Sequence, residues 1–442
     1  MDRNFEMGDL LGRLEKLREL LVFLGHPERS YRTVHIAGTK GKGSTCAILT
    51  SILTEAGATV GSFTSPHLYS FLERVTVNGI PCNESDFEEV LFYIRDKIAL
   101  FDSSLLSELT FFELMALFAF VYFERRSVDF AVIEVGMGGR LDATNICSPS
   151  VTVIANISYD HIEQLGPTLT EIAREKGGII KQGIPLVSSV TQEGPKNVLR
   201  EIVQSRKAPA YFLDEAFTVE PITVDEPFRF MTLLNNFPIR ADIDGLNLRM
   251  PGKHQRKNAA IAIAAALLLE DKFILDAATI RNGLAKSFLP VRVEVLQSDS
   301  NVPPLVIDGA HNRASTTAFI DSVYKLFAGR RKFLIFGTTL GKDVDGMLTD
   351  LVPNFDMIFL TQYTSSMRCF PPTGLRTIID AILPIYEPKN RPKEIQVIND
   401  NSLALQKCLE LANPNDVICI TGSIYLAAEL RKLFLNNIKS TT

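Results

Sequence analysis

The segment GTKGKGST at residues 38–45 has the residue types of a phosphate-binding loop. It lies between a short β-branched run and a helical pattern, and such a glycine-rich turn directs backbone N–H groups and a helix N-terminus at an anion. In this loop Lys42 would contact the β- and γ-phosphates of a nucleotide, and the Ser44 hydroxyl would bind magnesium. Only two residues separate Gly38 from Gly41, fewer than in the standard motif, so a glycine loop without a ligand is the alternative.

A second motif, EVGMGGRLDATN at residues 134–145, begins where the apolar run 128–136 ends. Its first residue, Glu134, is therefore expected at the carboxyl end of a buried strand. A carboxylate in that position, beside a phosphate loop, is well placed to hold Mg²⁺. The alternative is an ordinary solvated glutamate.

Four of the six histidines lie in polar motifs near the ends of expected elements: His67 in TSPHL, His161 in SYDHIE, His254 in GKHQRKN and His311 in DGAHN. Their number favours a shared cleft, although each alone is more typical of a structural histidine. No pair has the spacing of zinc ligands, and the chain lacks a GxSxG nucleophile motif. Together the motifs indicate phosphoryl chemistry with ATP and magnesium.

The elements expected around these motifs are those of an α/β protein. Segment 10–25 has leucines at helical spacing, and the alanine-rich segment 258–268 predicts a buried helix. The nearly unbroken apolar runs 128–136 and 151–158 are typical of strands covered by helices on both faces. The predicted fold class is α/β, with an N-terminal P-loop ATPase-like domain built on a doubly wound, mostly parallel sheet and a smaller C-terminal Rossmann-like α/β domain.

The domain boundary is predicted from a change of composition. Residues 288–304 contain three prolines and a polar QSDSN stretch, which is typical of a linker. We therefore expect one domain over 1–287, a linker over 288–304 and a second domain over 305–442. Beyond the linker, five short strand patterns alternate with helical stretches.

Composition excludes several classes of protein. The 442 residues are 46% hydrophobic and carry a formal charge of -5, which argues against a disordered chain and against a nucleic-acid partner. Six scattered cysteines without a CxxC pair indicate a reducing compartment. The first ten residues do not resemble a signal peptide, and the longest apolar stretch is shorter than the ~20 residues of a membrane span. We expect a cytoplasmic monomer without a membrane partner.

Taken in order, GTKGKGST, TSPHL, EVGMGGRLDATN, DHIEQLG with EKGGIIK, GKHQRKN, DGAHN and TGS resemble the folylpolyglutamate synthase/dihydrofolate synthase branch of the Mur ligase superfamily. The resemblance spans residues from about 10 to 430. It implies a Mur ligase central-type ATP-binding domain and a C-terminal glutamate ligase domain. It also implies an ATP-dependent amide ligase that joins L-glutamate to dihydropteroate, to (tetrahydro)folate or to both. The reaction would pass through an acyl phosphate and release ADP and phosphate.

The resemblance also implies roles for individual residues. The catalytic positions would be Lys42, Lys176 and His311, with Lys176 matching a lysine that the family carbamylates. ATP would contact Gly41, Lys42, Gly43, Ser44, Asn258, Arg292 and Asp308, and two magnesium ions would be held by Ser44, Ser65, Glu134 and His161. The pteroate or folate would lie near Thr110, Phe111, Phe112, Glu113, Leu141, Asp142 and Ala143, and glutamate near His311 and Ser423. By composition alone nothing distinguishes Lys176, and a phenylalanine pair on an apolar helix is more typical of a core. Val291 stands where the family has glycine.

Two alternative functions remain open at this stage. A cell-wall Mur ligase would add an amino acid to a UDP-linked sugar peptide, but such chains usually carry an extra domain before the glycine loop, which here begins at residue 38. A nucleotide-dependent switch without ligase chemistry would not need the polar motifs DGAHN and TGS in a second α/β domain.

Overall fold

The computed structural model describes residues 7–221, 227–233, 236–269, 273–297, 299 and 301–441. These residues form two compact units. The N-terminal unit runs to Phe288 without Met250–Lys253, and the C-terminal unit comprises Met250–Lys253 and the chain from Leu289 onward. Each unit has its own sheet and its own hydrophobic core.

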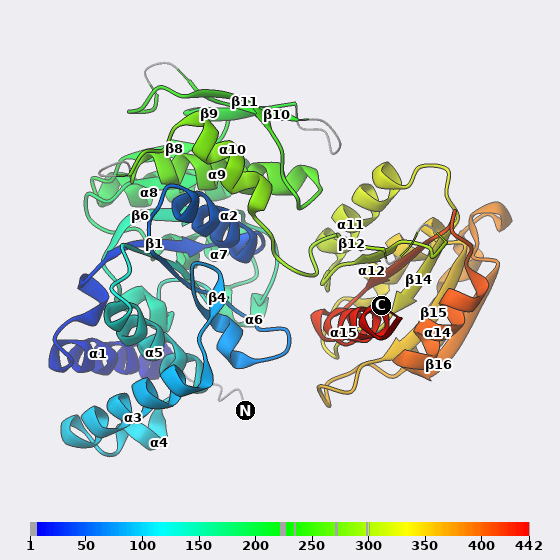
Figure 1. The fold of residues 1–442 in the computed structure, drawn as a ribbon, viewed down its shortest axis with the longest axis horizontal. Helices are drawn as coiled ribbons and strands as arrows, with labels where there is room; N and C mark the ends of the chain where they lie inside the picture. Colours follow the sequence, from blue (N-terminus) through cyan, green and yellow to red (C-terminus); the bar gives the residue numbers. More distant parts are fainter. Residues whose placement is uncertain are drawn as a thin grey trace. The chain divides into compact units, whose positions relative to one another are not determined.

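The N-terminal unit is built on an eight-stranded sheet with the order β4-β3-β2-β5-β1-β6-β7-β8 (Figure 1). Its strands are β1 Arg32–Ala37, β2 Val60–Phe63, β3 Val75–Val77, β4 Ile80–Pro81, β5 Phe130–Glu134, β6 Pro149–Ile154, β7 Leu186–Ser188 and β8 Ala210–Phe212. Six neighbouring strands of this sheet, β2, β5, β1, β6, β7 and β8, are parallel. Strands β3 and β4 add an antiparallel edge. The predicted doubly wound, mostly parallel sheet is confirmed. A separate antiparallel sheet of β9 Phe217–Glu220, β10 Phe228–Thr232 and β11 Asp242–Leu246 was not expected from the sequence.

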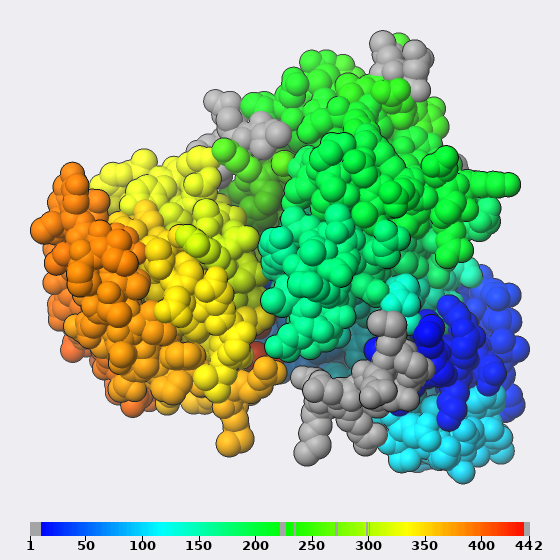
Figure 2. All heavy atoms as spheres, turned by 180° about the vertical axis from the view of Figure 1, so that it is seen from behind, coloured from blue at the N-terminus to red at the C-terminus, as the bar shows by residue number. Residues whose placement is uncertain are grey.

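Helices cover both faces of the large sheet, and its central strands β1 and β5 are accordingly buried along almost their whole length. The helices are α1 Met7–Phe23, α2 Lys42–Glu55, α3 Glu84–Phe101, α4 Leu105–Glu108, α5 Phe111–Arg125, α6 Ile162–Leu165, α7 Leu169–Gly177, α8 Glu193–Ser205, α9 Lys253–Leu267 and α10 Ala277–Lys286. On one face α2 packs on β1, β2 and β5, with α10 against α2. On the other, α5 packs on β2, and α1 and α3 lie side by side outside it (Figure 2).

The C-terminal unit contains a six-stranded sheet with the order β12-β13-β17-β14-β15-β16. Its strands are β12 Glu294–Leu296, β13 Leu305–Ile307, β14 Lys332–Phe336, β15 Met357–Gln362, β16 Glu394–Asp400 and β17 Val417–Thr421, and its helices are α11 Arg313–Leu326, α12 Val344–Leu351, α13 Pro372–Ile382, α14 Asn401–Leu411 and α15 Ile424–Thr441. The five strands expected from the sequence are all present and parallel, so the predicted smaller α/β unit is confirmed.

Residues 288–304, where we expect a linker, contain β12, which pairs antiparallel with β13 at the edge of the C-terminal sheet. A three-residue strand between prolines and polar residues has too short a pattern to be recognised by periodicity.

No helix in the described part of the chain is long and apolar enough to cross a membrane. The longest apolar stretch of the sequence forms α5, whose residues Met115–Phe123 are buried in the N-terminal core. Its apolar character therefore serves packing within the unit. All six cysteines lie within the described ranges as free thiols, and five of them are buried.

Candidate active site

The predicted phosphate and metal residues of the N-terminal unit gather at one edge of its sheet. Strand β1 pairs in parallel with β5, with Ile36 opposite Glu134, and β2 pairs with β5, with Phe63 opposite Ile133. Because parallel strands end at the same edge, the loops after β1 and β2 emerge beside Glu134. The Ser65 backbone N–H, in the loop after β2, donates to Glu134 Oε2 at 3.0 Å.

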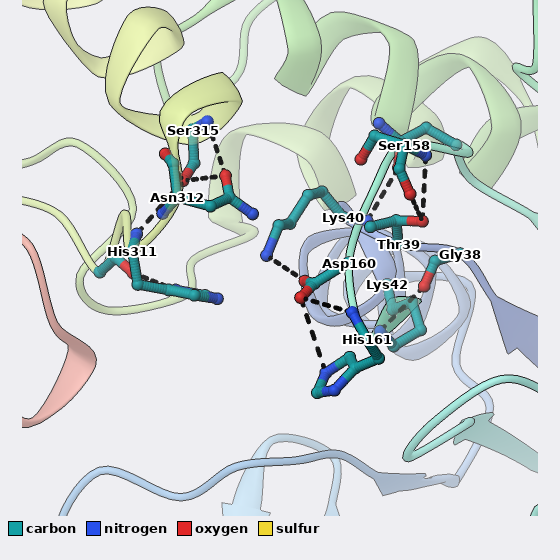
Figure 3. Close-up of polar contacts among 12 residues, drawn as sticks. Gly38, Thr39, Lys40, Lys42, Ser158, Asp160, His161, His311, Asn312 and Ser315 are labelled. Carbon is teal, nitrogen blue, oxygen red and sulfur yellow. Dashed lines mark hydrogen bonds and ion pairs between the residues drawn. The ribbon is translucent and has the colours of Figure 1, made fainter. Parts of the chain in front are cut away.

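The glycine loop leads directly into α2, as a phosphate-binding loop requires. The helix begins at Lys42, inside the glycine-rich segment 38–45, and Gly41 precedes it with a left-handed φ of 87°. The N–H groups of its first turn therefore belong to the loop itself and face the carboxyl edge of the sheet. Lys42 Nζ donates to Gly38 O at 3.0 Å, so its side chain curls back over the loop (Figure 3).

Asn258 of α9 closes the other side of this loop. A Cβ atom built on Gly41 would collide with Asn258 Oδ1, so glycine is required at this position for both its backbone conformation and the close approach. Asn258 is buried, and its Nδ2 donates to Gln255 Oε1 at 2.9 Å. The structure thus brings the predicted nucleotide residues Gly41 and Asn258 together.

Asp160 is a site residue that sequence reasoning missed. Its Oδ2 forms an ion pair with Lys40 Nζ at 2.9 Å, and its Oδ1 accepts the His161 N–H at 3.1 Å (Figure 3). Lys40 N also donates to Asn156 Oδ1 at 2.8 Å, so two residues after β6 hold the glycine loop. The carboxylate inside the SYDHIE motif was a usable signal, because it follows a strand that neighbours β1.

The motif histidines do not converge on a metal-ligand cluster within the described ranges, where no three His, Cys, Asp or Glu side chains gather as a metal site. His161 is half exposed, and its Nε2 lies 3.8 Å from Asp160 Oδ1. His67 Nδ1 accepts an N–H of Arg74 at 2.9 Å, and His254 is exposed near the start of α9. Of the predicted metal set, His161 is therefore the one histidine, and the other members are Ser44, Ser65 and Glu134.

Ser44 and Glu134 have the chemistry of magnesium ligands. Glu134 is 3% exposed at the tip of β5, and its carboxylate accepts the Ser65 N–H. Ser44 is equally buried and lies in the first turn of α2. Hydroxyl and carboxylate oxygens are hard donors of the kind that Mg²⁺ prefers. The residues present therefore fit a magnesium ion.

Lys176, in the last turn of α7, has an unusual environment for a lysine. It is 3% exposed, and its amine has no ion pair with any described residue. Burial, followed by the positive charge of Lys42, lowers the pKa of Lys176 from 10.5 to about 7, against an opposing effect of Asp160. A large fraction of the amine is therefore neutral near pH 7, which is the form that acts as a nucleophile.

The loop after β5 is held in place by Asp142 and by a buried histidine that sequence reasoning left out. Asp142 Oδ2 accepts the Met137 N–H at 2.9 Å, and its Oδ1 accepts the Thr144 hydroxyl. Because that hydroxyl donates to Asp142, His35 Nε2 must be the donor in its 2.9 Å contact with Thr144 Oγ1. Burial lowers the pKa of His35 to about 3 and raises the pKa of Asp142. The only signal for His35 was a polar residue inside an apolar strand pattern.

Part of the predicted folate region borders the same loop. A Cβ atom on Gly136 would lie 2.5 Å from the ring of Phe112, so that ring packs directly on the loop backbone. Phe112 also contacts Phe63, with 5.6 Å between ring centroids. Leu141 is half-buried and Ala143 is buried in the turn that Asp142 caps.

The remaining predicted folate residues begin α5. Thr110 caps the helix, and its N–H and hydroxyl both lie 2.7 Å from Glu113 Oε2. Glu113 is buried and forms a bidentate ion pair with Arg13 of α1, so its carboxylate is already engaged in structure. Phe111 is 51% exposed, and the Arg74 guanidinium lies 5.2 Å from its ring centroid. Of this set, Phe111 is the exposed ring, and it also contacts Phe71, with 6.4 Å between ring centroids.

The C-terminal unit holds the other predicted site residues at the carboxyl ends of β13 and β17. Asp308 is buried after β13, and its carboxylate accepts the N–H groups of Val293 at 2.8 Å and Ala310 at 2.7 Å. Burial raises the pKa of Asp308, while the charge of nearby Arg292 lowers it. Arg292 Nη1 donates to Val291 O at 3.1 Å.

His311 and Ser423 lie at the ends of neighbouring strands of this sheet. His311 Nδ1 lies 2.8 Å from Gly309 O, and because a carbonyl only accepts, the proton must be on Nδ1 (Figure 3). Ser423 is 2% exposed, and its hydroxyl accepts the Tyr425 N–H at 3.2 Å.

Comparisons with known proteins identify the family to which the chain belongs. The family profile of the Mur ligase middle domain matches residues 36–266, and that of the Mur ligase glutamate ligase domain matches residues 291–424. The dihydrofolate synthase/folylpolyglutamate synthase of Bacillus subtilis is 35% identical over 426 residues, covering 95% of this chain and 94% of the relative.

Two solved structures add to the comparison. A Mycobacterium tuberculosis folylpolyglutamate synthase complexed with ADP superposes with a TM-score of 0.84 at 30% identity, over 96% of this chain and 94% of the other. A Yersinia pestis folylpolyglutamate synthase/dihydrofolate synthase complexed with AMPPNP and a Mn ion gives 0.81 at 26% identity, over 96% and 93%. The predicted resemblance is confirmed: the chain belongs to the Mur ligase family, in its folylpolyglutamate synthase/dihydrofolate synthase branch.

Proposed function

We propose that this protein is an ATP-dependent carbon–nitrogen ligase that joins L-glutamate to dihydropteroate, to reduced folates or to both. The observation that carries the proposal is the sheet edge of the N-terminal unit. There a phosphate loop with Lys42 and Ser44 lies beside buried Glu134, and Lys42 and Asp160 act electrostatically on buried Lys176. The ADP and Mn complexes of its relatives support ATP and a divalent metal as its co-substrate and cofactor.

The phosphate loop would bind the triphosphate of ATP. The first-turn N–H groups of α2, at Gly43 and Ser44, would donate to phosphate oxygens, and Lys42 would exchange its bond to Gly38 O for one to a phosphate. Ser44, Ser65, Glu134 and His161 would hold two magnesium ions. Bound there, magnesium would neutralise phosphate charge during phosphoryl transfer. His161 would have to turn its half-exposed ring from Asp160.

Lys176 is suited to carbamylation. Its neutral amine would attack CO₂ to form an N–C bond and release a proton, which converts a cation into an anion. The buried position disfavours the ammonium form, and the charge of Lys42 nearby favours an anion there. A carbamate at Lys176 would supply a further oxygen ligand for a metal ion or an anchor for phosphate-bound charge.

The two chemical steps follow from the need to activate a carboxylate. A carboxylate oxygen of the pteroate or folate attacks the γ-phosphorus of ATP, and ADP leaves. The α-amino group of L-glutamate then attacks the acyl phosphate, phosphate leaves with that oxygen, and the amine gives up a proton. Lys42 would stabilise the charge that develops on the transferred phosphoryl group in both steps.

The substrate regions are proposed from position and exposure. Phe111 offers the exposed ring on which a pterin could stack, and Thr110, Phe112, Glu113, Leu141, Asp142 and Ala143 line the adjoining turns. Asn258, Arg292 and Asp308 would complete nucleotide binding. His311, whose Nδ1 carries the proton, would use Nε2 as a base toward glutamate, which Ser423 would contact. We further propose domains over 1–287 and 305–442 joined through 288–304, and a cytoplasmic monomer.

ADP release tests the proposal. Purified full-length protein would be given Mg-ATP and L-glutamate with dihydropteroate in one reaction and tetrahydrofolate in another. We expect ADP release that depends on glutamate, and products heavier by one glutamyl unit. A gain with only one substrate would assign one activity. ADP release that does not depend on glutamate with either substrate would favour the nucleotide switch. The match of residues 291–424 to a glutamate ligase domain does not favour that alternative.

A further inference from the structure

Two valines in the C-terminal unit adopt a backbone conformation that valine rarely takes. Val291 has a φ of 54° and Val293 a φ of 48°, and both side chains are 1% exposed. A positive φ is unfavourable for a β-branched residue because Cβ crowds the backbone, so the surrounding structure must hold it. Arg292 lies between them, and its backbone direction is therefore set by two strained neighbours.

Hydrogen bonds hold this strained segment on both sides. Val291 N donates to Glu294 Oε2 at 3.0 Å, and Val291 O accepts the Gly309 N–H at 3.0 Å. Val293 N donates to Asp308 Oδ2 at 2.8 Å. The two peptide groups that flank Arg292 contain Val291 O and Val293 N. Each of these atoms therefore has a hydrogen-bond partner outside residues 291–293.

Glu294 is in turn fixed by Arg431 of α15. Arg431 Nε donates to Glu294 Oε2 at 2.7 Å, and Nη2 donates to Oε1 at 2.9 Å. The side chains of Glu294 and Arg431 are 4% and 15% exposed, so water screens the pair little. The carboxylate that caps Val291 therefore has one fixed orientation.

We propose that Glu294 and Arg431 are positioning residues that hold Val291 in its left-handed conformation and thereby aim Arg292 at the nucleotide. This inference rests on the proposed function, which makes Arg292 a nucleotide-binding residue. In this proposal Glu294 and Arg431 act through Arg292 and not by contact with the nucleotide. Loss of the pair lets the segment relax toward negative φ and turns Arg292 away.

The same unit contains a matched control. Arg331 forms a bidentate pair with Asp416, with Nε and Nη2 at 3.0 and 2.6 Å from its oxygens. Asp416 Oδ2 also accepts the N–H three residues earlier, of Asn413, just as Glu294 accepts that of Val291. Asn413 does not have a positive φ. Asp416→Asn therefore removes the same kind of interaction without a strained segment or a proposed nucleotide residue.

Calorimetric titration of the full-length protein with Mg-ADP tests the inference without turnover. We expect Arg292→Ala and Glu294→Gln each to weaken ADP binding about tenfold. Arg431→Lys keeps the charge but loses the bidentate geometry, so it should also weaken ADP binding. Asp416→Asn should lower the melting temperature and leave the ADP Kd unchanged. The double variant Arg292→Ala/Glu294→Gln should bind no more weakly than Arg292→Ala, because Glu294 acts only through Arg292.

A glycine at position 291 tests the strain directly. Glycine tolerates positive φ, so Val291→Gly/Glu294→Gln should bind ADP more tightly than Glu294→Gln alone. Any of three results would overturn the inference while leaving the proposed function standing. Glu294→Gln could bind ADP with wild-type affinity, the losses of affinity could add in Arg292→Ala/Glu294→Gln, or Val291→Gly/Glu294→Gln could bind ADP no more tightly than Glu294→Gln. Wild-type affinity in Arg292→Ala would instead refute the nucleotide role of Arg292 and this inference with it.

Discussion

Replacing Lys176 with methionine should stabilise the protein while abolishing its activity. Methionine is nearly isosteric with the lysine stem and fills the buried space without a charge. The wild-type lysine has a folded-state pKa of about 7 against its ordinary 10.5. The folded protein therefore binds fewer protons than the unfolded chain between these values, and wild-type stability rises with pH in that window.

The magnitude follows from this shift. At 1.36 kcal/mol per pKa unit, burying the lysine costs about 5 kcal/mol at pH 6 and about 2 kcal/mol at pH 9. The free energy of unfolding of Lys176→Met should exceed that of the wild type, and this difference should shrink by about 3 kcal/mol from pH 6 to pH 9. Chemical denaturation at several pH values, in buffers freed of CO₂ so that no carbamate forms, measures the difference.

The control is Lys407→Met on α14, where the lysine is exposed. This substitution removes a solvated lysine and serves as the reference for the effect of a lysine-to-methionine change on stability. A Lys176→Met difference in stability that varies with pH no more than the Lys407→Met difference would refute the reasoning, because the buried amine would then titrate as it does in the unfolded chain. Detectable ligase activity in Lys176→Met would refute the need for a carbamate.

Three further predictions concern the glycine loop and the histidine beneath the site. Lys42→Ala should lower kcat by about a hundredfold or more with an unchanged circular dichroism spectrum, and near-normal turnover would remove its phosphate role. Gly41→Ala should lose ADP binding in calorimetry because its Cβ meets Asn258, whereas Gly57→Ala, with a φ of 90° and open space around it, should lose only stability. If both variants bind ADP with the same affinity, the close approach of Asn258 to Gly41 is not needed for nucleotide binding. His35 has a folded pKa of about 3 against an ordinary 6.5, so wild-type stability should fall as the pH falls from 6.5 to 3. In His35→Gln the slope of stability against pH in that range should be smaller by about 1.4 kcal/mol per unit, and equal slopes would contradict the assignment.

The architecture was largely predictable because long apolar runs and a glycine loop determine it. The runs at 128–136 and 151–158 became β5 and β6, and the sheet edge where Glu134 lies follows from parallel pairing alone. Short strands in polar surroundings escaped prediction, as β12 shows. Three residues do not establish a period, and their strand character comes from pairing with β13.

The motifs predicted which loops gather at the sheet edge, but they did not predict the surroundings of single residues. Lys176 looked like a surface lysine, and its low pKa arises from burial that no local pattern reveals. Asp160 and His35 act through partners more than a hundred residues away in sequence, Lys40 and Thr144, so tertiary pairing alone identifies them. Valine itself gives no sequence signal for a left-handed turn, and the one indication of the positive φ of Val291 was that it stands where the family has glycine.

Transfer of an oxygen atom tests the central claim most directly. Dihydropteroate or tetrahydrofolate labelled with ¹⁸O in the carboxylate that receives glutamate would be incubated with the protein, Mg-ATP and L-glutamate, and the released phosphate analysed by mass spectrometry. An acyl phosphate intermediate predicts one ¹⁸O atom in each phosphate released with a new glutamyl amide. Unlabelled phosphate would mean that ATP hydrolysis does not pass through the substrate carboxylate, and would contradict the proposed reaction.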